Sequence, residues 1–382
     1  MERAVLLVAT ATSYIGTARI PSALSKAGFE VSLLAPRNTL AEKSRFVTKV
    51  GHLPDNATPL QWVFAFAAMV KASSPRLVLP CDDTALRLLQ TLALSPPQNM
   101  QPALHLQLAT LIRESLGSAD YYRISIDKTL LPGAAEAVGV RVPPYAILSD
   151  LHAAEAFVAD HGYPVVLKRG HGAAGDWVAI AADRAELEQA FAQFSSATTL
   201  DIEGSGARRL LIQAHIPGRI RHQGVAAWKG DVVAGFAREK LVSHPPPKGP
   251  ATVTRYFRAP EVREFSEALV KQFGMNGLFS FEYVAHERTG QAYLLEINRR
   301  ITPGTHTGAL VGVDICAALY AVLNGMPPPS RKNLDEGEEH VIAHFPQEWL
   351  RDPGSHYLRD CRVDAPWDDP DLFEAMLASR HG

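Results

Sequence analysis

The sequence predicts an α/β protein with more than one domain. Its first 80 residues alternate apolar, strand-like segments with amphipathic, helix-like segments, which is the rhythm of parallel βαβ units. After residue 160 a second group of strands follows, with charged residues at strand ends and a glycine-rich loop. At 382 residues the chain is also too long for one ordinary hydrophobic core.

Composition narrows the partners that we expect. Hydrophobic residues make up 47% and charged residues 20% of the chain, and the net charge is −2, so no broad basic field favours nucleic acid. The three cysteines Cys81, Cys316 and Cys361 form no Cys-x-x-Cys pair, which indicates neither a disulfide framework nor a zinc site. No segment reaches membrane-spanning length, and the apolar run 4–9 is too short for a signal peptide. We therefore expect a cytoplasmic protein without a membrane partner.

The first domain is predicted from strands at residues 5–9, 30–35 and 76–80, with a helix at 18–27. The turn at residues 10–16 holds a single glycine where a dinucleotide-binding fold carries Gly-x-Gly-x-x-Gly. Because a pyrophosphate needs those glycines for close backbone approach, a nicotinamide site is disfavoured here.

Asp82 and Asp83 follow the strand at 76–80, at the carboxyl edge of the predicted sheet. This edge commonly binds small ligands, but either aspartate also suits the cap of the helix that follows. The sequence leaves both interpretations open. A helix at about residues 104–116 then leads to a predicted domain boundary near 118.

The second domain begins with a short helix that we expect to carry Lys128. Residues 163–168 form a strand that ends in Lys168, and a loop with three glycines, Gly170, Gly172 and Gly175, follows. Backbone N–H groups of such a loop can close on phosphates while the lysine supplies a charge from the strand beneath. Glycines that serve only a hairpin turn are the competing interpretation.

Residues 210–218 read as a strand that runs into a Pro-Gly turn. Backbone groups there could pair with the edge of an adenine ring while aliphatic neighbours cover its faces, as flat apolar ligands require. A plain strand and turn is the alternative. The candidate contacts are Gln213, Ala214, His215 and Ile216.

A pair of later strands carries the strongest chemical pattern. Glu296, Asn298 and Arg300 alternate along one strand and share a face, where a neighbouring strand could add Glu282. Two carboxylates and an amide oxygen suit Mg²⁺, or Mn²⁺ in its place, with water and phosphate completing the shell. A solvated, ion-paired strand face is the alternative, but apolar neighbours such as Leu295 indicate a core on the opposite face.

Several cations lie between these motifs, and a solvated loop explains any one of them as well as a site does. The candidates also include Lys248, Arg255 and Arg258, and we favour Arg238 and Lys240, on or just beyond a strand at 232–237, over Lys248 as contacts to a phosphate or a carboxylate. His306, in the loop at 301–308, could orient an acceptor or serve only as a hydrogen-bonding residue. No role is predicted for the acidic segment 330–382.

The order of these motifs resembles the ATP-grasp superfamily, and within it the carbamoyl-phosphate-synthase-like and biotin-carboxylase-like carboxylate–amine ligases. The resemblance covers roughly residues 1–325. It implies a Rossmann-like pre-ATP-grasp domain over residues 1–118 and a two-lobed α+β ATP-grasp domain over 119–328, with a lid subdomain at about 125–210. A small C-terminal appendage over 329–382 completes the expected layout.

The resemblance also implies roles. Lys128 and Lys168 would contact ATP phosphates beneath the glycine loop, Arg300 would steady the transferred phosphoryl group, and the metal would lie on Glu282, Glu296 and Asn298. The implied reaction activates a small carboxylate, such as an amino acid, as an acyl phosphate that an amine then attacks, releasing ADP and phosphate. The chain departs from the family at Ala214, Arg219 and Arg169, which leaves the ribose contacts and the lid geometry open.

Two other classes compete with this interpretation. One is an ATP-binding regulatory protein without turnover, against which the complete set of Lys168, Glu282, Glu296, Asn298 and Arg300 argues. The other is a nicotinamide oxidoreductase, which the missing glycine fingerprint disfavours. The sequence does not identify the substrates or the oligomeric state, although a homodimer is the commonest assembly.

Overall fold

The computed structural model describes residues 3–11, 17–170, 177–196, 209–246, 249–330 and 333–379. The chain divides into two compact units. Unit 1 contains residues 1–119, 221–280 and 298–382, and unit 2 contains residues 120–220 and 281–297. The boundaries predicted near residues 118 and 328 remain predictions. The α/β fold class, with a parallel N-terminal sheet, is confirmed.

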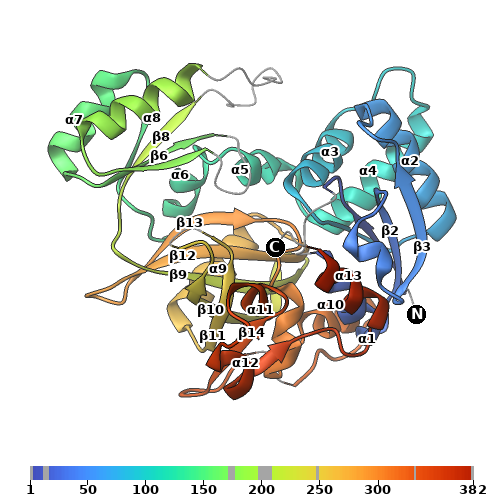
Figure 1. The fold of residues 1–382 in the computed structure, drawn as a ribbon. Coiled ribbons are helices and arrows are strands. Elements are labelled where there is room, and N and C mark those ends of the chain that lie inside the picture. The colour runs from blue at the N-terminus through green and yellow to red at the C-terminus, as the bar shows by residue number, and fades with distance from the viewer. Residues whose placement is uncertain are drawn as a thin grey trace. The chain divides into compact units, whose positions relative to one another are not determined.

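Unit 1 opens with a parallel sheet in the order β3-β2-β1-β4. The apolar side chains of β1 from Val5 to Val8 are fully buried, because strands of a parallel sheet are covered on both faces. Helices α2, α3 and α4 pack against this sheet (Figure 1). The elements are β1 (Ala4–Val8), α1 (Ile20–Ala27), β2 (Glu30–Pro36), η2 (Leu40–Lys43), β3 (Val47–Leu53), α2 (Pro59–Ser73), β4 (Leu77–Pro80), α3 (Asp83–Leu94) and α4 (Pro102–Leu116).

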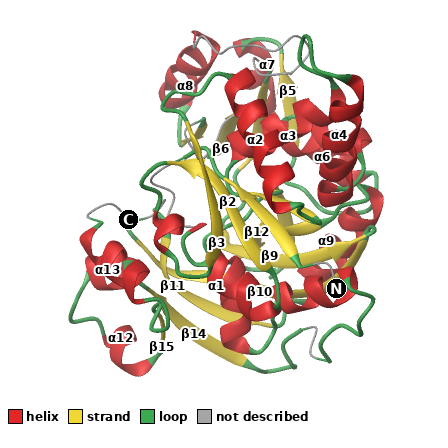
Figure 2. Cartoon of the chain, turned by 90° about the vertical axis from the view of Figure 1, so that its right-hand side faces the viewer, coloured by secondary structure: helices red, strands yellow, loops and turns green. Residues whose placement is uncertain are grey.

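A seven-stranded sheet follows the order β13-β12-β9-β10-β11-β14-β15. Several of its long strands are drawn in yellow in Figure 2. Strand β10 pairs antiparallel with both β9 and β11, and Arg238 lies opposite His222 on one side and Tyr256 on the other. The strands and helices of this part of the chain are β9 (Gly218–Trp228), β10 (Asp231–Ser243), β11 (Ala251–Phe257), α9 (Pro260–Gln272), β12 (Gly277–His286), β13 (Ala292–Asn298), η4 (Thr305–Val311) and α10 (Ile315–Leu323).

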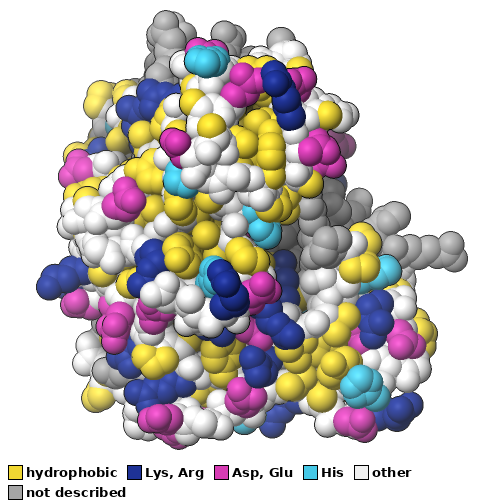
Figure 3. All heavy atoms as spheres, turned by 90° about the vertical axis from the view of Figure 1, so that its left-hand side faces the viewer, with side chains coloured by type: hydrophobic (Ala, Val, Ile, Leu, Met, Phe, Trp, Pro, Cys, Tyr) yellow, Lys and Arg dark blue, Asp and Glu magenta, His cyan; other side chains and the backbone are white. Residues whose placement is uncertain are grey.

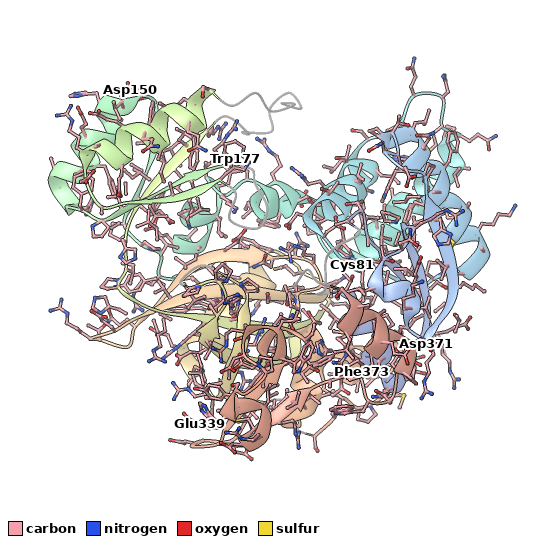
Figure 4. All side chains as sticks on the ribbon, viewed as in Figure 1. Cys81, Asp150, Trp177, Glu339, Asp371 and Phe373 are labelled. Atoms are coloured by element: carbon pink, nitrogen blue, oxygen red, sulfur yellow. The ribbon has the colours of Figure 1, made fainter. Side chains whose placement is uncertain are left out.

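The C-terminal segment, expected only as an appendage, adds two strands to this sheet. Strand β14 pairs antiparallel with β11, and β15 pairs parallel with β14. Figure 4 labels Glu339 at the start of β14 and Phe373 on the last helix, whose ring stacks on Phe345 at 5.0 Å. The segment is therefore integral to unit 1. Its elements are β14 (Glu339–His344), α11 (Gln347–Arg351), α12 (His356–Asp360), β15 (Arg362–Asp364) and α13 (Pro370–Ala378).

Unit 2 contains a four-stranded antiparallel sheet in the order β5-β8-β6-β7. Helices α7 and α8 pack on it (Figure 1) and enclose a separate core around Phe157, Leu167 and Phe194. The elements are η3 (Ala119–Tyr121), α5 (Tyr122–Ile126), α6 (Leu131–Glu136), β5 (Tyr145–Leu148), α7 (Leu151–His161), β6 (Val165–Arg169), β7 (Val178–Ala181), α8 (Arg184–Ser196) and β8 (Leu210–Ala214).

Within the described ranges, no single helix is long and apolar enough to cross a membrane. Helices η4 and α10 meet the length and composition required only when taken together, and they are bent by 102° at the break between them. On the face drawn in Figure 3, basic and acidic side chains are interspersed.

Candidate functional site

Two lysines and two glutamates that the sequence predicts as site residues come together in unit 2. The Nζ atom of Lys128 lies 3.2 Å from the Oε1 atom of Glu296. Lys168 interacts electrostatically with Glu296, Lys128 and Glu282. The predicted phosphate and metal motifs, which lie more than 110 residues apart in the sequence, therefore share one place.

Lys168 is the buried member of this cluster. It lies on β6 with only 8% of its surface exposed, on the face opposite to Val165 and Leu167, which belong to the core of unit 2. Burial, together with the charge of Lys128, lowers the pKa of Lys168 from 10.5 to about 8, although Glu296 and Glu282 oppose the change. A buried ammonium whose pKa is lowered in this way is poised to gain a polyanionic ligand.

Lys128 lies in a turn between α5 and α6, so our expectation that it belongs to a helix is wrong. The side chain of Asp127 accepts hydrogen bonds from the backbone N–H of Thr129 (3.0 Å) and from its hydroxyl (2.7 Å), which favours a turn over a helix. The backbone N–H of Lys128 donates to the carbonyl oxygen of Gly170 at 2.8 Å. This bond ties the turn to the end of β6.

The glycine loop is described only at its edges. Gly172 and Gly175 lie outside the described residues. The N–H of Gly170 donates to the carbonyl oxygen of Arg209 at 2.9 Å, so this amide holds the strands together. Arg169, one of the departures from the family pattern, is buried with its guanidinium 4.8 Å from the ring centroid of Trp177, which Figure 4 labels. Its charge has a structural partner in a cation–π contact.

The segment predicted for adenine lies at the end of β8. Gln213 is buried in the sheet between Tyr145 and Val166. The N–H groups of Ala214 and His215 donate to the carbonyl oxygens of Pro144 (2.9 Å) and Pro164 (3.2 Å). Among the described residues, the N–H of Ile216 has no such partner. The prediction of backbone contacts to adenine therefore narrows to Ile216 as the donor.

The predicted metal ligands lie on neighbouring strands. Glu282 is on β12, and Glu296 and Asn298 are two residues apart on β13, so alternation turns the latter two side chains to one face. The described residues hold no group of three His, Cys, Asp or Glu side chains suited to a metal. Two carboxylates and an amide are instead a partial set of hard oxygen donors, which suits Mg²⁺ shared with nucleotide phosphates.

Arg300 has an acidic partner that the sequence did not reveal. Its Nε atom donates to the Oδ1 atom of Asp83 at 2.8 Å, within unit 1. The neighbouring Asp82 caps α3 by accepting from the N–H of Ala85 at 2.8 Å, and it also accepts from the N–H and the hydroxyl of Thr10. Asp82 therefore has the structural role of a helix cap, as one of the two interpretations expected.

The cations between the strands separate into two sets. Arg238 and Lys240 lie within β10, which extends further than predicted, and they share one face of it. Arg255 instead binds Glu239 at 2.8 Å and Glu339 at 3.3 Å, so it belongs to an ion-pair network on β10, β11 and β14. Arg221 completes this network at 3.2 Å from Glu239.

We predict that Glu239→Gln lowers the free energy of unfolding by about 2–3 kcal/mol. Glu239 is only 1% exposed, and its loss removes the carboxylate that Arg221 binds and leaves Arg255 with the exposed Glu339 alone. The partial exposure of both arginines makes the cost smaller than for a fully buried pair. Urea denaturation measures the change. The matched control is Glu339→Gln, which removes an exposed partner of the same Arg255 and should cost less than about 0.5 kcal/mol. Equal effects would contradict the interpretation.

His306 is a buried structural residue. Its Nε2 atom lies 2.7 Å from the Oδ2 atom of Asp364, and its Nδ1 atom is also buried, without a partner among the described residues. Burial lowers the pKa of His306 below 6.5, although Asp364 opposes the change. Asp364 also binds Arg19 at 2.9 Å. This arrangement favours the hydrogen-bonding interpretation of His306 over proton transfer to a substrate.

These sheets and the lysine–glutamate cluster, in the predicted motif order, define the ATP-grasp class. Residues 127–328, more than half of the chain, match the family described as carbamoyl-phosphate synthase L chain, ATP binding domain. The chain belongs to this family.

Curated relatives share limited identity. The 2-oxoglutarate carboxylase small subunit of Hydrogenobacter thermophilus is 27% identical over 231 residues, which cover 59% of this chain and 44% of that subunit. Human mitochondrial pyruvate carboxylase is 26% identical over 212 residues, 53% of this chain and 18% of that enzyme. The match thus spans less than half the length of each of these two relatives.

Solved structures agree in fold. The biotin carboxylase of Campylobacter jejuni has a TM-score of 0.65 at 16% identity and covers 88% of this chain and 74% of its own. The biotin carboxylase domain of the H. thermophilus enzyme was solved as a dimer with MgADP, ADP and bicarbonate. It has a TM-score of 0.63 at 18% identity, and the match covers 88% of this chain and 73% of that one. N5-carboxyaminoimidazole synthetase of Staphylococcus aureus has a TM-score of 0.62 at 11% identity, and the match covers 89% of this chain and 81% of that one.

Proposed function

We propose that the protein is an ATP- and Mg²⁺-dependent carboxylate–amine ligase that forms an acyl phosphate and releases ADP and phosphate. One observation carries this proposal: Lys128, Lys168, Glu282 and Glu296 come together in unit 2 of a chain whose family is defined by an ATP-binding domain. The cluster pairs cations for phosphates with carboxylates for a metal, as phosphoryl transfer between two anions requires.

Each residue then has a physical task. Lys128 and Lys168 bind phosphate oxygens and offset their charge, and backbone groups near Ile216 receive the adenine. Glu282, Glu296 and Asn298 would hold Mg²⁺, or Mn²⁺, which supplies charge stabilisation at the phosphates. Arg300, which Asp83 binds at 2.8 Å, would steady the transferred phosphoryl group, as the family resemblance implies. Gly172 and Gly175 lie outside the described residues, and their contact with the phosphates stays a prediction from the sequence.

Two compounds are candidates for the carboxylate substrate that ATP activates. The first is an amino acid or another small carboxylate that is joined to an amine. The second is bicarbonate, so that the product is a carboxylated amine; the carboxylases among the relatives favour it. An ATP-binding regulatory protein without turnover remains the competing class. We keep a homodimer and a cytoplasmic location as predictions.

Substrate-dependent nucleotide turnover tests the proposal. The purified protein is incubated with Mg-ATP and with pools of amino acids, small carboxylic acids, bicarbonate and amines, while ADP, AMP, phosphate and new products are quantified. We expect ADP and phosphate together with a condensed or carboxylated product. AMP would refute the acyl-phosphate route. Tight ATP binding without turnover in any pool would favour the regulatory class instead.

A further inference from the structure

Arg238 is a buried cation without an acidic partner. It lies on β10 with 7% of its surface exposed, and among the described residues no carboxylate is within ion-pair distance of its guanidinium. The adjacent Glu239 points to the opposite face of the strand, where Arg221 and Arg255 bind it. A guanidinium that is buried without a counter-charge is costly, so an anionic ligand would relieve a penalty that the fold already bears.

The backbone of Gly304 fixes how this guanidinium is presented. A Cβ atom at position 304 would clash with the Cζ, Nη1 and Nη2 atoms of Arg238. Nearly equal distances to these three atoms place Gly304 over the flat face of the group. The φ angle of Gly304 is −101°, open to other residues, so glycine is needed there for space alone. A guanidinium covered on its face presents its N–H donors at the edge, the geometry that matches a planar carboxylate.

Lys240 adds a second charge on the same face. It lies two residues after Arg238, and the described residues give it no acidic partner either. His222, opposite Arg238 across the sheet, feels both cations: burial first, then Arg238 and Lys240, lower its pKa well below 6.5, so it is neutral at pH 7. The face therefore has two positive charges and no neutralising group on β9 or β10.

The chemistry of activation decides which carboxylate fits here. A carboxylate that becomes an acyl phosphate loses its own charge. A tight contact between an arginine and this carboxylate would therefore stabilise the ground state more than the transition state. A permanent arginine partner is therefore better suited to a carboxylate that keeps its charge throughout the reaction. Building on the function proposed above, we propose that Arg238, with Lys240, binds a second, unreacting carboxylate of the substrate, which makes the substrate a dicarboxylate or a dicarboxylic amino acid.

Paired acids and amides test this subsite. The probes are succinate, glutarate, aspartate and glutamate, each beside its monoamide, measured both by ADP release and by calorimetric binding in the presence of a non-hydrolysable Mg-ATP analogue. We expect at least one diacid to bind and turn over, and its monoamide to lose about 100-fold in kcat/KM. Arg238→Met should remove this discrimination, mainly through KM, and leave ATP affinity unchanged. Arg238→Lys should restore part of it.

Two further variants sharpen the test. Gly304→Ala should displace the guanidinium and raise KM for the diacid about tenfold without changing ATP affinity. Arg263, a partly exposed arginine of α9 that pairs with Glu267, supplies the matched control: Arg263→Met should behave as wild type. A wild-type enzyme that turns over only monocarboxylates or bicarbonate, or an Arg238→Met variant that still discriminates, would overturn the subsite and leave the ligase standing. Diacid binding that depends on Arg238 without ADP release would reject the ligase alone.

Discussion

Glu296→Gln should abolish Mg²⁺-dependent ADP formation while the fold persists. The substitution removes one hard carboxylate from the predicted metal site, and we expect the rate to fall at least about 100-fold. The amide keeps the shape of the side chain. Since Glu296 is about one-third exposed and its bond to Lys128 is a partly exposed ion pair, the cost in unfolding free energy should stay below about 1 kcal/mol.

Metal-free binding separates this explanation from simple damage to the site. Glu296 repels phosphates when no cation is present, so Glu296→Gln should bind ATP as tightly as wild type, or more tightly, in the presence of a chelator. The matched control is Glu287→Gln, at an exposed turn position between β12 and β13, which should leave turnover unchanged. Unchanged turnover in Glu296→Gln, or a loss of metal-free ATP affinity, would contradict the assignment.

Local patterns predicted the buried parts of the fold well. Strands β1, β2 and β4 were visible because parallel strands covered on both faces are continuous apolar runs. Strand β3 was missed because Lys49 and His52 are exposed on it, so the strand at the sheet's edge has no apolar run. Strand β14 was missed for another reason: its partner β11 lies more than 80 residues earlier, and no local pattern encodes such a pairing.

The candidate site shows the same division. The alternation of Glu296 and Asn298 and the strand position of Lys168 were readable because a strand fixes side-chain direction every second residue. Which cation meets which carboxylate was not readable, since it depends on the packing of distant segments. Asp83 binds Arg300 across 217 residues, and Asp364 binds His306 across 58. In sequence Arg255 resembles a site cation, whereas in the structure it forms an ion pair with Glu239.

Lys168→Met should weaken ATP binding and stabilise the protein. Losing a charged contact to the phosphates should weaken ATP affinity about 100-fold. In the free protein, however, the pKa of Lys168 is about 8 instead of 10.5, so keeping this lysine protonated at neutral pH costs roughly 3 kcal/mol. Because this cost already includes the attraction to Glu296 and Glu282, we expect methionine to recover most of it, about 2–3 kcal/mol.

The difference in unfolding free energy between wild type and Lys168→Met should depend on pH, which a change in packing alone would not cause. The unfolded chain binds a proton at Lys168 up to about pH 10.5, whereas the folded protein releases it from about pH 8, so the stability of wild type relative to Lys168→Met should rise between these values. Below pH 8 the difference should be constant. Urea denaturation of both proteins from pH 7 to 10 measures it, with Lys271→Met on the exposed side of α9 as the control. A pH-independent difference would show that Lys168 is not held in the buried, cation-destabilising site on which its role toward ATP rests.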